Sequence, residues 1–135
     1  MPDDTAADKL AVLECLAEYC YAIDFLECDA LDHLFTEDAV LHFSLGDVGR
    51  EDITVSGGKA ISDYFREILP GLGAAAPKHP LTNHVVHVDG ERATSRSYAA
   101  VAAGLYTGEY ERSATGWRLS RLTVKYFARP SRRDR

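Results

Sequence analysis

One carboxylate stands in an otherwise apolar stretch of the chain. Asp24 is the only charged residue in the segment 22–26, where its immediate neighbours are Ile23 and Phe25. A carboxylate buried in such a setting must be paired or must have a raised pKa, because an unpaired buried charge is costly. The same residue could instead face water at a helix end or cap the next turn. If it is buried, Asp24 is a candidate for proton chemistry or for orienting a catalytic base.

His79 is the candidate for that base. It precedes the part of the chain in which strand-forming residues accumulate, and histidine can take and return a proton near neutral pH. An ordinary loop histidine is the alternative. Asn83 follows four residues later, where it could donate a hydrogen bond to a substrate oxygen or hold the loop of His79. Its position is equally compatible with both roles.

Tyrosines close to Asp24 could supply a polarising hydroxyl. Tyr19 and Tyr21 precede the aspartate by five and three residues, and five residues correspond to about 140° around an ideal helix. A tyrosine hydroxyl can polarise a substrate carbonyl, but the ring can equally be ordinary core. Tyr98 is a further candidate on a later strand. Apolar residues that could line a cavity, or simply build the core, are Phe43, Phe65, Leu69, Tyr106 and Trp117.

The sequence contains no motif that indicates a metal site or a nucleotide-binding site. His84 and His87 are spaced like a ligand pair, but residues i and i+3 of a strand point to opposite faces of a sheet. Together with His79 they form no coherent tetrahedral ligand set. The chain also lacks the glycine-rich phosphate loops and the serine-hydrolase motif. We therefore expect no metal site and no bound nucleotide.

The composition is that of an ordinary globular chain. The 135 residues have a mass of 14.9 kDa, are 46% hydrophobic and carry a formal net charge of -6, which fits a single domain over 1–135. We find no apolar run of membrane-spanning length and no secretion signal, and the acidity argues against a nucleic-acid partner. We expect a cytoplasmic protein with flexible tails at 1–7 and 129–135 and reduced thiols at Cys15, Cys20 and Cys28.

The first half of the chain has helical periodicity. Apolar spacing predicts helices over 6–26, 30–35 and 58–69. Asp29 is the expected N-cap of the second helix, and residues 36–38 are expected to end it.

The second half is rich in β-branched and aromatic residues. Together with two earlier segments, it predicts strands over 39–45, 53–55, 81–88, 92–103, 105–112 and 117–127. The Gly/Ala/Pro segment 70–80 is either the rim of a pocket or only a connection, and the small apolar run 99–103 suggests a roomy pocket wall. Helices followed by antiparallel strands indicate an α+β fold, in which a long curled sheet wrapped by helices leaves a concave cavity.

Six segments, in this order and spacing, resemble the SnoaL-like branch of the nuclear transport factor 2-like superfamily over about 8–128. They are 19–24, 31–40, 58–65, 79–83, 88–93 and 116–119. The resemblance implies a cone of curled, mixed and mostly antiparallel sheet with three helices and one internal pocket. It also implies that no cofactor is needed, since these relatives generally work by acid–base chemistry in a dry pocket.

The resemblance further implies roles for the residues singled out above. In the scytalone dehydratase-like group, Asp24 matches an aspartate that orients a histidine, and His79 matches the general base. The spacing of Tyr19 before Asp24 matches bile acid 7α-dehydratase. The implied function is a lyase, isomerase or cyclase that acts on a cyclic hydrophobic molecule of polyketide, terpenoid or steroid type.

Other members of the superfamily have no catalytic role. They include small subunits of ring-hydroxylating dioxygenases, so a ligand-binding or oxygenase-associated subunit is the alternative function. Relatives commonly dimerise through the outer face of the sheet, and a homodimer is therefore expected by resemblance. The expected partner in either case is a small hydrophobic molecule rather than a nucleic acid or a membrane.

Overall fold

The computed structural model describes residues 5–73, 76–101 and 103–128. The helices are α1 (Thr5–Asp24), α2 (Cys28–Leu31) and α3 (Gly58–Ile68), with short 3₁₀ segments η1 (Gly46–Val48) and η2 (Leu69–Gly71). The strands are β1 (Phe35–Ser44), β2 (Ile53–Ser56), β3 (Leu81–Asp89), β4 (Arg92–Ala99), β5 (Gly104–Ser113) and β6 (Gly116–Tyr126).

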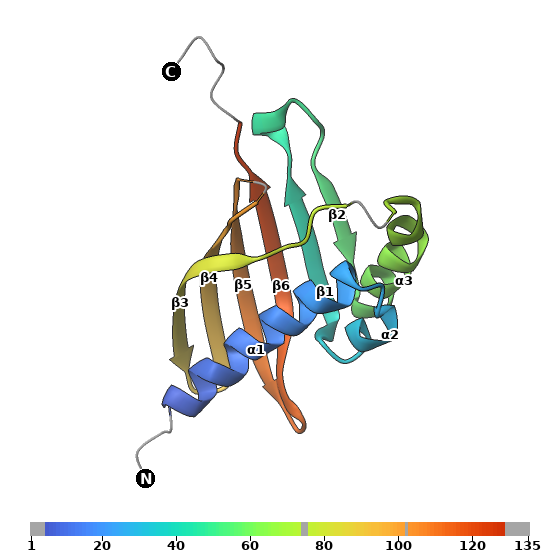
Figure 1. The fold of residues 1–135 in the computed structure, drawn as a ribbon. Helices are drawn as coiled ribbons and strands as arrows, with labels where there is room; N and C mark the ends of the chain where they lie inside the picture. Colours follow the sequence, from blue (N-terminus) through green and yellow to red (C-terminus); the bar gives the residue numbers. More distant parts are fainter. Residues whose placement is uncertain (1–4, 74–75, 102, 129–135) are drawn as a thin grey trace.

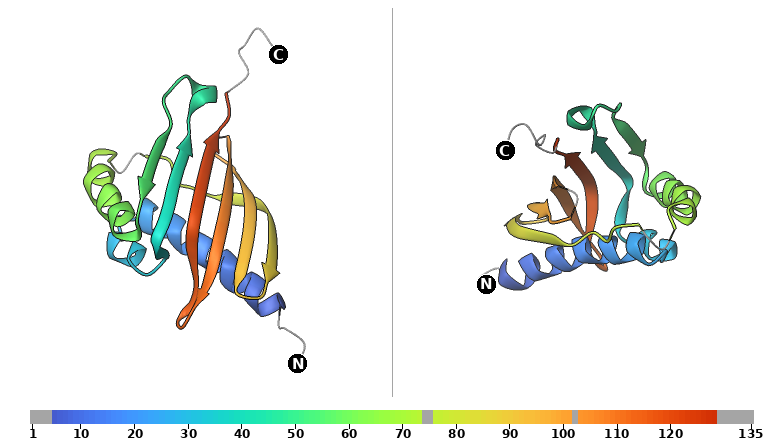
Figure 2. Two further views of the ribbon diagram at one scale, coloured as in Figure 1. Left: turned by 180° about the vertical axis from the view of Figure 1, so that it is seen from behind. Right: turned by 45° about the horizontal axis from the view of Figure 1, so that its top comes forward.

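The six strands form one sheet in the order β2-β1-β6-β5-β4-β3. All neighbouring strands are antiparallel except β1 and β6, which run parallel. Helix α1 crosses one face of the curled sheet, and α3 packs beside β1 and β2 (Figure 1). Seen from behind in Figure 2, the opposite face carries no helix of the described chain. This architecture confirms the predicted α+β fold with a mostly antiparallel curled sheet.

The core lies between α1 and the face of the sheet that this helix crosses. α1 buries Val12, Leu16, Tyr19 and Ile23, whose spacing places them along one face of the helix. Alternate residues of the strands close the core, among them Leu41, Ala93, Ser95, Ser97, Tyr106, Tyr110, Leu122 and Val124. Because α1 is fixed along its length in this way, the residues at its C-terminal end have a defined position relative to the sheet.

The second predicted helix is too long. The prediction covers 30–35, but α2 ends at Leu31 and Phe35 already pairs with Leu119 of β6. The Leu119 N–H also donates to the Leu34 carbonyl at 2.7 Å. Pairing with a strand far along the chain therefore overrides the local helical spacing, and the helix begins at Cys28, one residue before the predicted N-cap.

The predicted strand over 92–103 is also too long. β4 ends at Ala99, and the Ala100 N–H donates to the Pro80 carbonyl at 3.0 Å before β5 begins at Gly104. Of the apolar run 99–103, Ala99 ends β4 and residues 100, 101 and 103 lie in a turn, while Ala102 lies outside the described residues.

The predicted tails are described only in part. α1 already begins at Thr5, inside the tail predicted for 1–7. Residues 1–4 and the predicted tail 129–135 lie outside the described residues.

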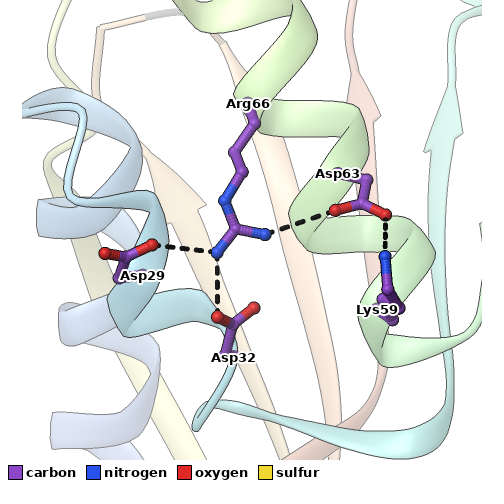
Figure 3. Close-up of polar contacts among 5 residues, drawn as sticks. All are labelled: Asp29, Asp32, Lys59, Asp63 and Arg66. Carbon is purple, nitrogen blue, oxygen red and sulfur yellow. Dashed lines mark hydrogen bonds and ion pairs between the residues drawn. The ribbon is translucent and has the colours of Figure 1, made fainter.

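An ionic cluster joins α2 to α3 (Figure 3). Arg66 donates through Nη2 to Asp29 at 3.0 Å and to Asp32 at 2.8 Å, and through Nη1 to Asp63 at 3.3 Å. Lys59 binds the other oxygen of Asp63 at 2.6 Å. We call these five residues the α2–α3 ionic cluster. It fixes the short helix α2, which has only four residues, against the longer α3.

Candidate active site

Helix α1 ends at Asp24 because the chain turns sharply over the next residues. Leu26 adopts a left-handed backbone conformation with φ of 59°, which is uncommon for a residue other than glycine. The Glu27 N–H then donates to the Ala22 carbonyl at 2.8 Å, a closure typical of helix C-termini. Asp24 is thereby held in the last turn of α1, next to the segment that leads into β3.

Both carboxylate oxygens of Asp24 contact His79. Oδ1 lies 2.5 Å from Nδ1 of the imidazole, and Oδ2 accepts the backbone N–H of His79 at 2.9 Å. The side chain of Asp24 is 10% exposed and that of His79 is 31% exposed. Because Nδ1 faces the carboxylate, Nε2 is the ring nitrogen that can exchange a proton with a ligand. The structure thus brings the two principal predicted residues together from positions 55 residues apart.

Lys78 supports the same junction from the side of the loop. Its Nζ donates to the backbone carbonyl of Asp24 at 3.0 Å and lies 5.0 Å from the centre of the Phe25 ring. Phe25 in turn stacks on Tyr21, with ring centres 6.1 Å apart. The end of α1 is therefore tied to the segment before β3 by several contacts as well as by the Asp24–His79 pair.

The pair lies where two cavities meet. A cavity of about 520 Å³ runs between α1 and the segment 78–84, and a second of about 400 Å³ lies between the end of α1 and the segment 69–79. Asp24 and His79 line both cavities. The walls of the first are mainly apolar, and its remaining polar side chains include Glu14 and His84. A weakly polar space next to an oriented imidazole is suited to a small apolar ligand.

Two further predicted residues lie in these cavities. Tyr21 lines the first cavity, although its side chain also remains 62% exposed at the surface. Leu69 lines the second, together with part of the predicted rim 70–80. Residues 74 and 75 of that rim lie outside the described residues.

Tyr19 lies in the core and lines neither of the two cavities. Its ring is 1% exposed and packs edge-on against Phe35 and Phe65, with ring centres 5.9 Å apart in both cases. Burial raises the pKa of the Tyr19 phenol well above its usual range and also raises that of Tyr106. Phe65 and Tyr106 are likewise core residues, and Phe43 packs against the core. The turn of the helix separates Tyr19 from the side on which Asp24 meets His79.

Three other predicted residues lie away from the Asp24–His79 pair. Tyr98 is 53% exposed and pairs with Thr82, and Asn83 is exposed in a bulge of β3. Trp117 lies near the opposite end of α1, where its Nε1 donates to Asp8 at 3.2 Å. None of the three residues lines either of the two cavities at the Asp24–His79 pair.

His84 is a polar cavity residue that was not predicted to belong to the site. It lines the first cavity, and its Nδ1 lies 2.6 Å from the Ser97 hydroxyl on β4. His87 of the same strand pairs with Thr94 and is exposed. Simple strand alternation does not reveal the direction of His84, because a bulge interrupts the strand just before it.

Two structural features are absent from the described residues. In that part of the chain no three His, Cys, Asp or Glu side chains are arranged to hold a metal ion. None of its helices is long and apolar enough to cross a membrane. The three cysteines are free, and burial raises the pKa of Cys15 and of Cys20 to about 12.

Comparison with known proteins assigns the chain to a family. The SnoaL-like domain model matches residues 4–123. The chain belongs to this family. An uncharacterized protein of Mycobacterium tuberculosis is 30% identical over 137 residues, covering 90% of this chain and 87% of the relative. A second uncharacterized relative, from Mycobacterium bovis, has the same identity and coverage.

Solved structures confirm the fold of this SnoaL-like domain. A Novosphingobium aromaticivorans protein provisionally named an aromatic ring hydroxylase is 28% identical, with a TM-score of 0.75 over 93% of each chain. An NTF2-like protein with a cystatin-like fold from the same organism is 22% identical, with a TM-score of 0.78 over 96% of this chain and 88% of the other. A third protein from that organism, provisionally named a scytalone dehydratase, is 18% identical, with a TM-score of 0.76 over 93% and 88%.

Proposed function

We propose that this SnoaL-like domain is a cofactor-independent acid–base enzyme that acts on a small, cyclic and largely apolar molecule. His79 is the base, and Asp24 orients it. The observation that carries the proposal is the contact of Asp24 Oδ1 with His79 Nδ1 at 2.5 Å, beside a mainly apolar cavity of about 520 Å³. Such a cavity would enclose most of a ligand of two or three fused rings.

The proposed step is the removal of a proton from carbon. Nε2 of His79 accepts a proton from the carbon next to a carbonyl group, and the electron pair of that C–H bond forms a new double bond. In a dehydration, the carbon–oxygen bond of a neighbouring hydroxyl breaks, and the imidazolium returns the proton to it so that water leaves. In an isomerisation, the ligand already holds a carbon–carbon double bond next to the deprotonated carbon. The new double bond forms to the carbonyl carbon as the carbonyl electrons move to oxygen. The imidazolium then returns the proton to the far carbon of the original double bond, whose electron pair forms the new C–H bond, while the carbonyl re-forms and the double bond shifts by one position.

Asp24 acts through His79 and does not itself contact the ligand in this proposal. Both of its oxygens are engaged by the histidine, one by the ring and one by the backbone N–H. A carboxylate in this position holds the ring with Nε2 towards the cavity and stabilises the positive charge that develops on the imidazole. Asp24 is therefore a positioning residue, in agreement with the role implied by the resemblance.

The comparisons support an enzyme of this fold, and they are also compatible with a second, non-catalytic function. The provisional name of the scytalone dehydratase neighbour agrees with a dehydration, but at 18% identity that likeness concerns the fold alone. The neighbour at 28% identity is provisionally named an aromatic ring hydroxylase, which favours the alternative of a ligand-binding or oxygenase-associated subunit. The contact geometry of Asp24 and His79 favours the enzyme, because a passive binding subunit has no need of an oriented base.

The test is turnover of a panel of cyclic ketones and hydroxyketones in D₂O. Deuterium incorporation next to the carbonyl and loss of water are followed by NMR and mass spectrometry for wild type, His79→Ala and Asp24→Asn. His87→Ala serves as a matched control, because His87 is an exposed histidine of β3. We expect turnover by wild type and the control, and strong loss in the other two variants. Unchanged turnover in both variants would refute the role of the pair, and an inactive protein that co-purifies with an oxygenase would establish the alternative.

A further inference from the structure

A β-bulge early in β3 determines which side chains of this strand face α1. The pairs Thr82–Tyr98 and Val85–Arg96 leave one more residue in β3 than in β4 between them. Asn83 takes up this extra residue with a left-handed backbone, at φ of 57°, which asparagine tolerates better than most residues. Bulges of this kind often re-aim a side chain next to a functional site.

The bulge turns His84 to the inner side of the sheet. Leu81, before the bulge, packs against the core, and strict alternation from it would continue with odd-numbered residues. After the bulge, however, the inward residues are even-numbered, because Val86 is 8% exposed and Val88 packs against the core. His84 shares the side of Val86 and Val88 and lines the cavity, although it remains exposed to solvent.

Ser97 holds the His84 ring from β4. The hydroxyl lies 2.6 Å from Nδ1, and Ser97 is 1% exposed. A buried hydroxyl requires a hydrogen-bond partner, and this contact provides one. Since Nδ1 is engaged by Ser97, Nε2 is the nitrogen left to meet a ligand. His79 is held in the same manner, with its Nδ1 on Asp24.

We propose that His84 binds a second oxygen of the ligand through Nε2. The cavity then selects a ring compound with oxygen functions at two separated positions, one at His79 and one at His84. Pro80 and Leu81 lie between the two histidines and also line this cavity, so the part of the ligand between its oxygens is apolar. The inference rests on the proposed function for the role of His79, and it adds the chemical class of the ligand. Ser97 is a positioning residue for His84.

The test compares two ligands that differ by one hydroxyl group. The probes are 2-tetralone and 6-hydroxy-2-tetralone, which share an apolar bicyclic body, and their affinities are measured by NMR titration. One hydrogen bond should make wild type bind the hydroxylated probe about three- to tenfold more tightly. His84→Ala should bind both probes equally, while His87→Ala, the exposed control on the same strand, should keep the preference.

Ser97 variants separate positioning from mere packing. Ser97→Ala should reduce the preference for the hydroxylated probe without changing the affinity for 2-tetralone, and Ser97→Thr should restore it, with folding checked by circular dichroism. The inference is overturned if wild type shows no preference, or if His84→Ala keeps it. Deuterium exchange into 2-tetralone reports on His79 alone. Absent exchange with an intact His84-dependent preference would therefore refute the proposed function but not the binding role of His84.

Discussion

Two regions of this molecule use carboxylates to join a helix to another segment, and they differ in burial. In the α2–α3 ionic cluster, the side chain of Asp29 is fully exposed and that of Asp63 is 51% exposed. At the end of α1, the side chain of Asp24 is 10% exposed and borders two cavities. Solvent screens the first set of charges, so each of its ion pairs contributes little to stability. The buried carboxylate acts on its single partner with much less screening.

The charge balance of the two regions also differs. The hydrogen bond from Arg66 lowers the pKa of Asp32, and the hydrogen bond from Lys59 lowers the pKa of Asp63. These groups remain ionised at neutral pH and serve as permanent anchors between helices. Asp24 instead contacts the imidazole of His79, with Oδ1 2.5 Å from Nδ1. The comparison teaches that the proposed proton chemistry belongs where one shielded carboxylate meets one imidazole, and not where charges are most numerous.

The largest expected difference between the regions is in activity. His79→Ala should lower kcat/KM for the substrate found in the panel by about 10²-fold or more, because a general base contributes on that order. The kcat/KM of Arg66→Met, a variant in the α2–α3 ionic cluster, should stay within about twofold of wild type, because Arg66 takes no part in the proposed general-base catalysis. Equal losses in the two variants would remove the functional distinction between the regions.

The thiols next to the two regions should differ in reactivity. Burial, followed by the charge of Asp24, raises the pKa of Cys20 to about 12, whereas Cys28 at the start of α2 is partly exposed. With iodoacetamide at pH 8, Cys28 should be alkylated at least about tenfold faster than Cys20, because the thiolate is the reactive form. Mass spectrometry of timed digests measures the rates, and Cys15, which is also buried, is the internal control. Equal rates at Cys20 and Cys28 would show that the α1 region opens readily to solvent.

The substitution Tyr19→Phe tests whether the Tyr19 hydroxyl belongs to the site or to the core. The ring is packed on Phe35 and Phe65 and lines neither cavity, so removal of the hydroxyl should change kcat/KM by less than about threefold. Steady-state kinetics of the variant, with a melting curve as a control for folding, gives the answer. A loss as large as that of His79→Ala would place the phenol at the reacting atoms and restore its predicted catalytic role.

The smallest effect is expected on the stability of the protein when the α2–α3 ionic cluster is disrupted. The hydrogen bond from Arg66 is the main reason that the pKa of Asp32 is lowered from its ordinary value of 3.8. This contact therefore stabilises the fold above pH 3.8, and the stabilisation is lost as the pH falls through the lower pKa that Asp32 has in the folded state. Arg66→Met should therefore have a slightly lower melting temperature than wild type at pH 7. The difference should shrink below pH 3.8 and in high salt. A difference that grows towards acid pH would contradict this account.

Local sequence patterns predicted most of the helices and strands, but not the residues at which pairing with distant segments ends them. α1 follows from helical spacing, and β3 and the first part of the strand predicted over 92–103 follow from β-branched and aromatic residues. The start of β1 at Phe35 does not, because it depends on pairing with β6 near the other end of the chain. In the same way, the end of β4 at Ala99 depends on the contact of Ala100 with Pro80.

The residues of the candidate site were likewise predicted only in part from local patterns. Asp24 and His79 can be selected from residue type, apolar surroundings and family resemblance. The sequence does not reveal that Trp117 packs near Asp8 at the far end of α1, because a large aromatic residue fits the same pattern in a core as in a cavity. The sequence also does not reveal that Tyr98 is exposed, because the face of the sheet to which a side chain points depends on the register of the strand.

By itself, the sequence determined that helices precede strands and that one carboxylate stands in apolar surroundings, because these are properties of neighbouring residues. Only the tertiary structure decided that Asp24 meets a histidine 55 residues away. It also decided that the bulge at Asn83 turns His84 towards the same cavity. The physical reason is that contacts between distant segments depend on the register and curl of the whole sheet, which no short stretch of chain encodes.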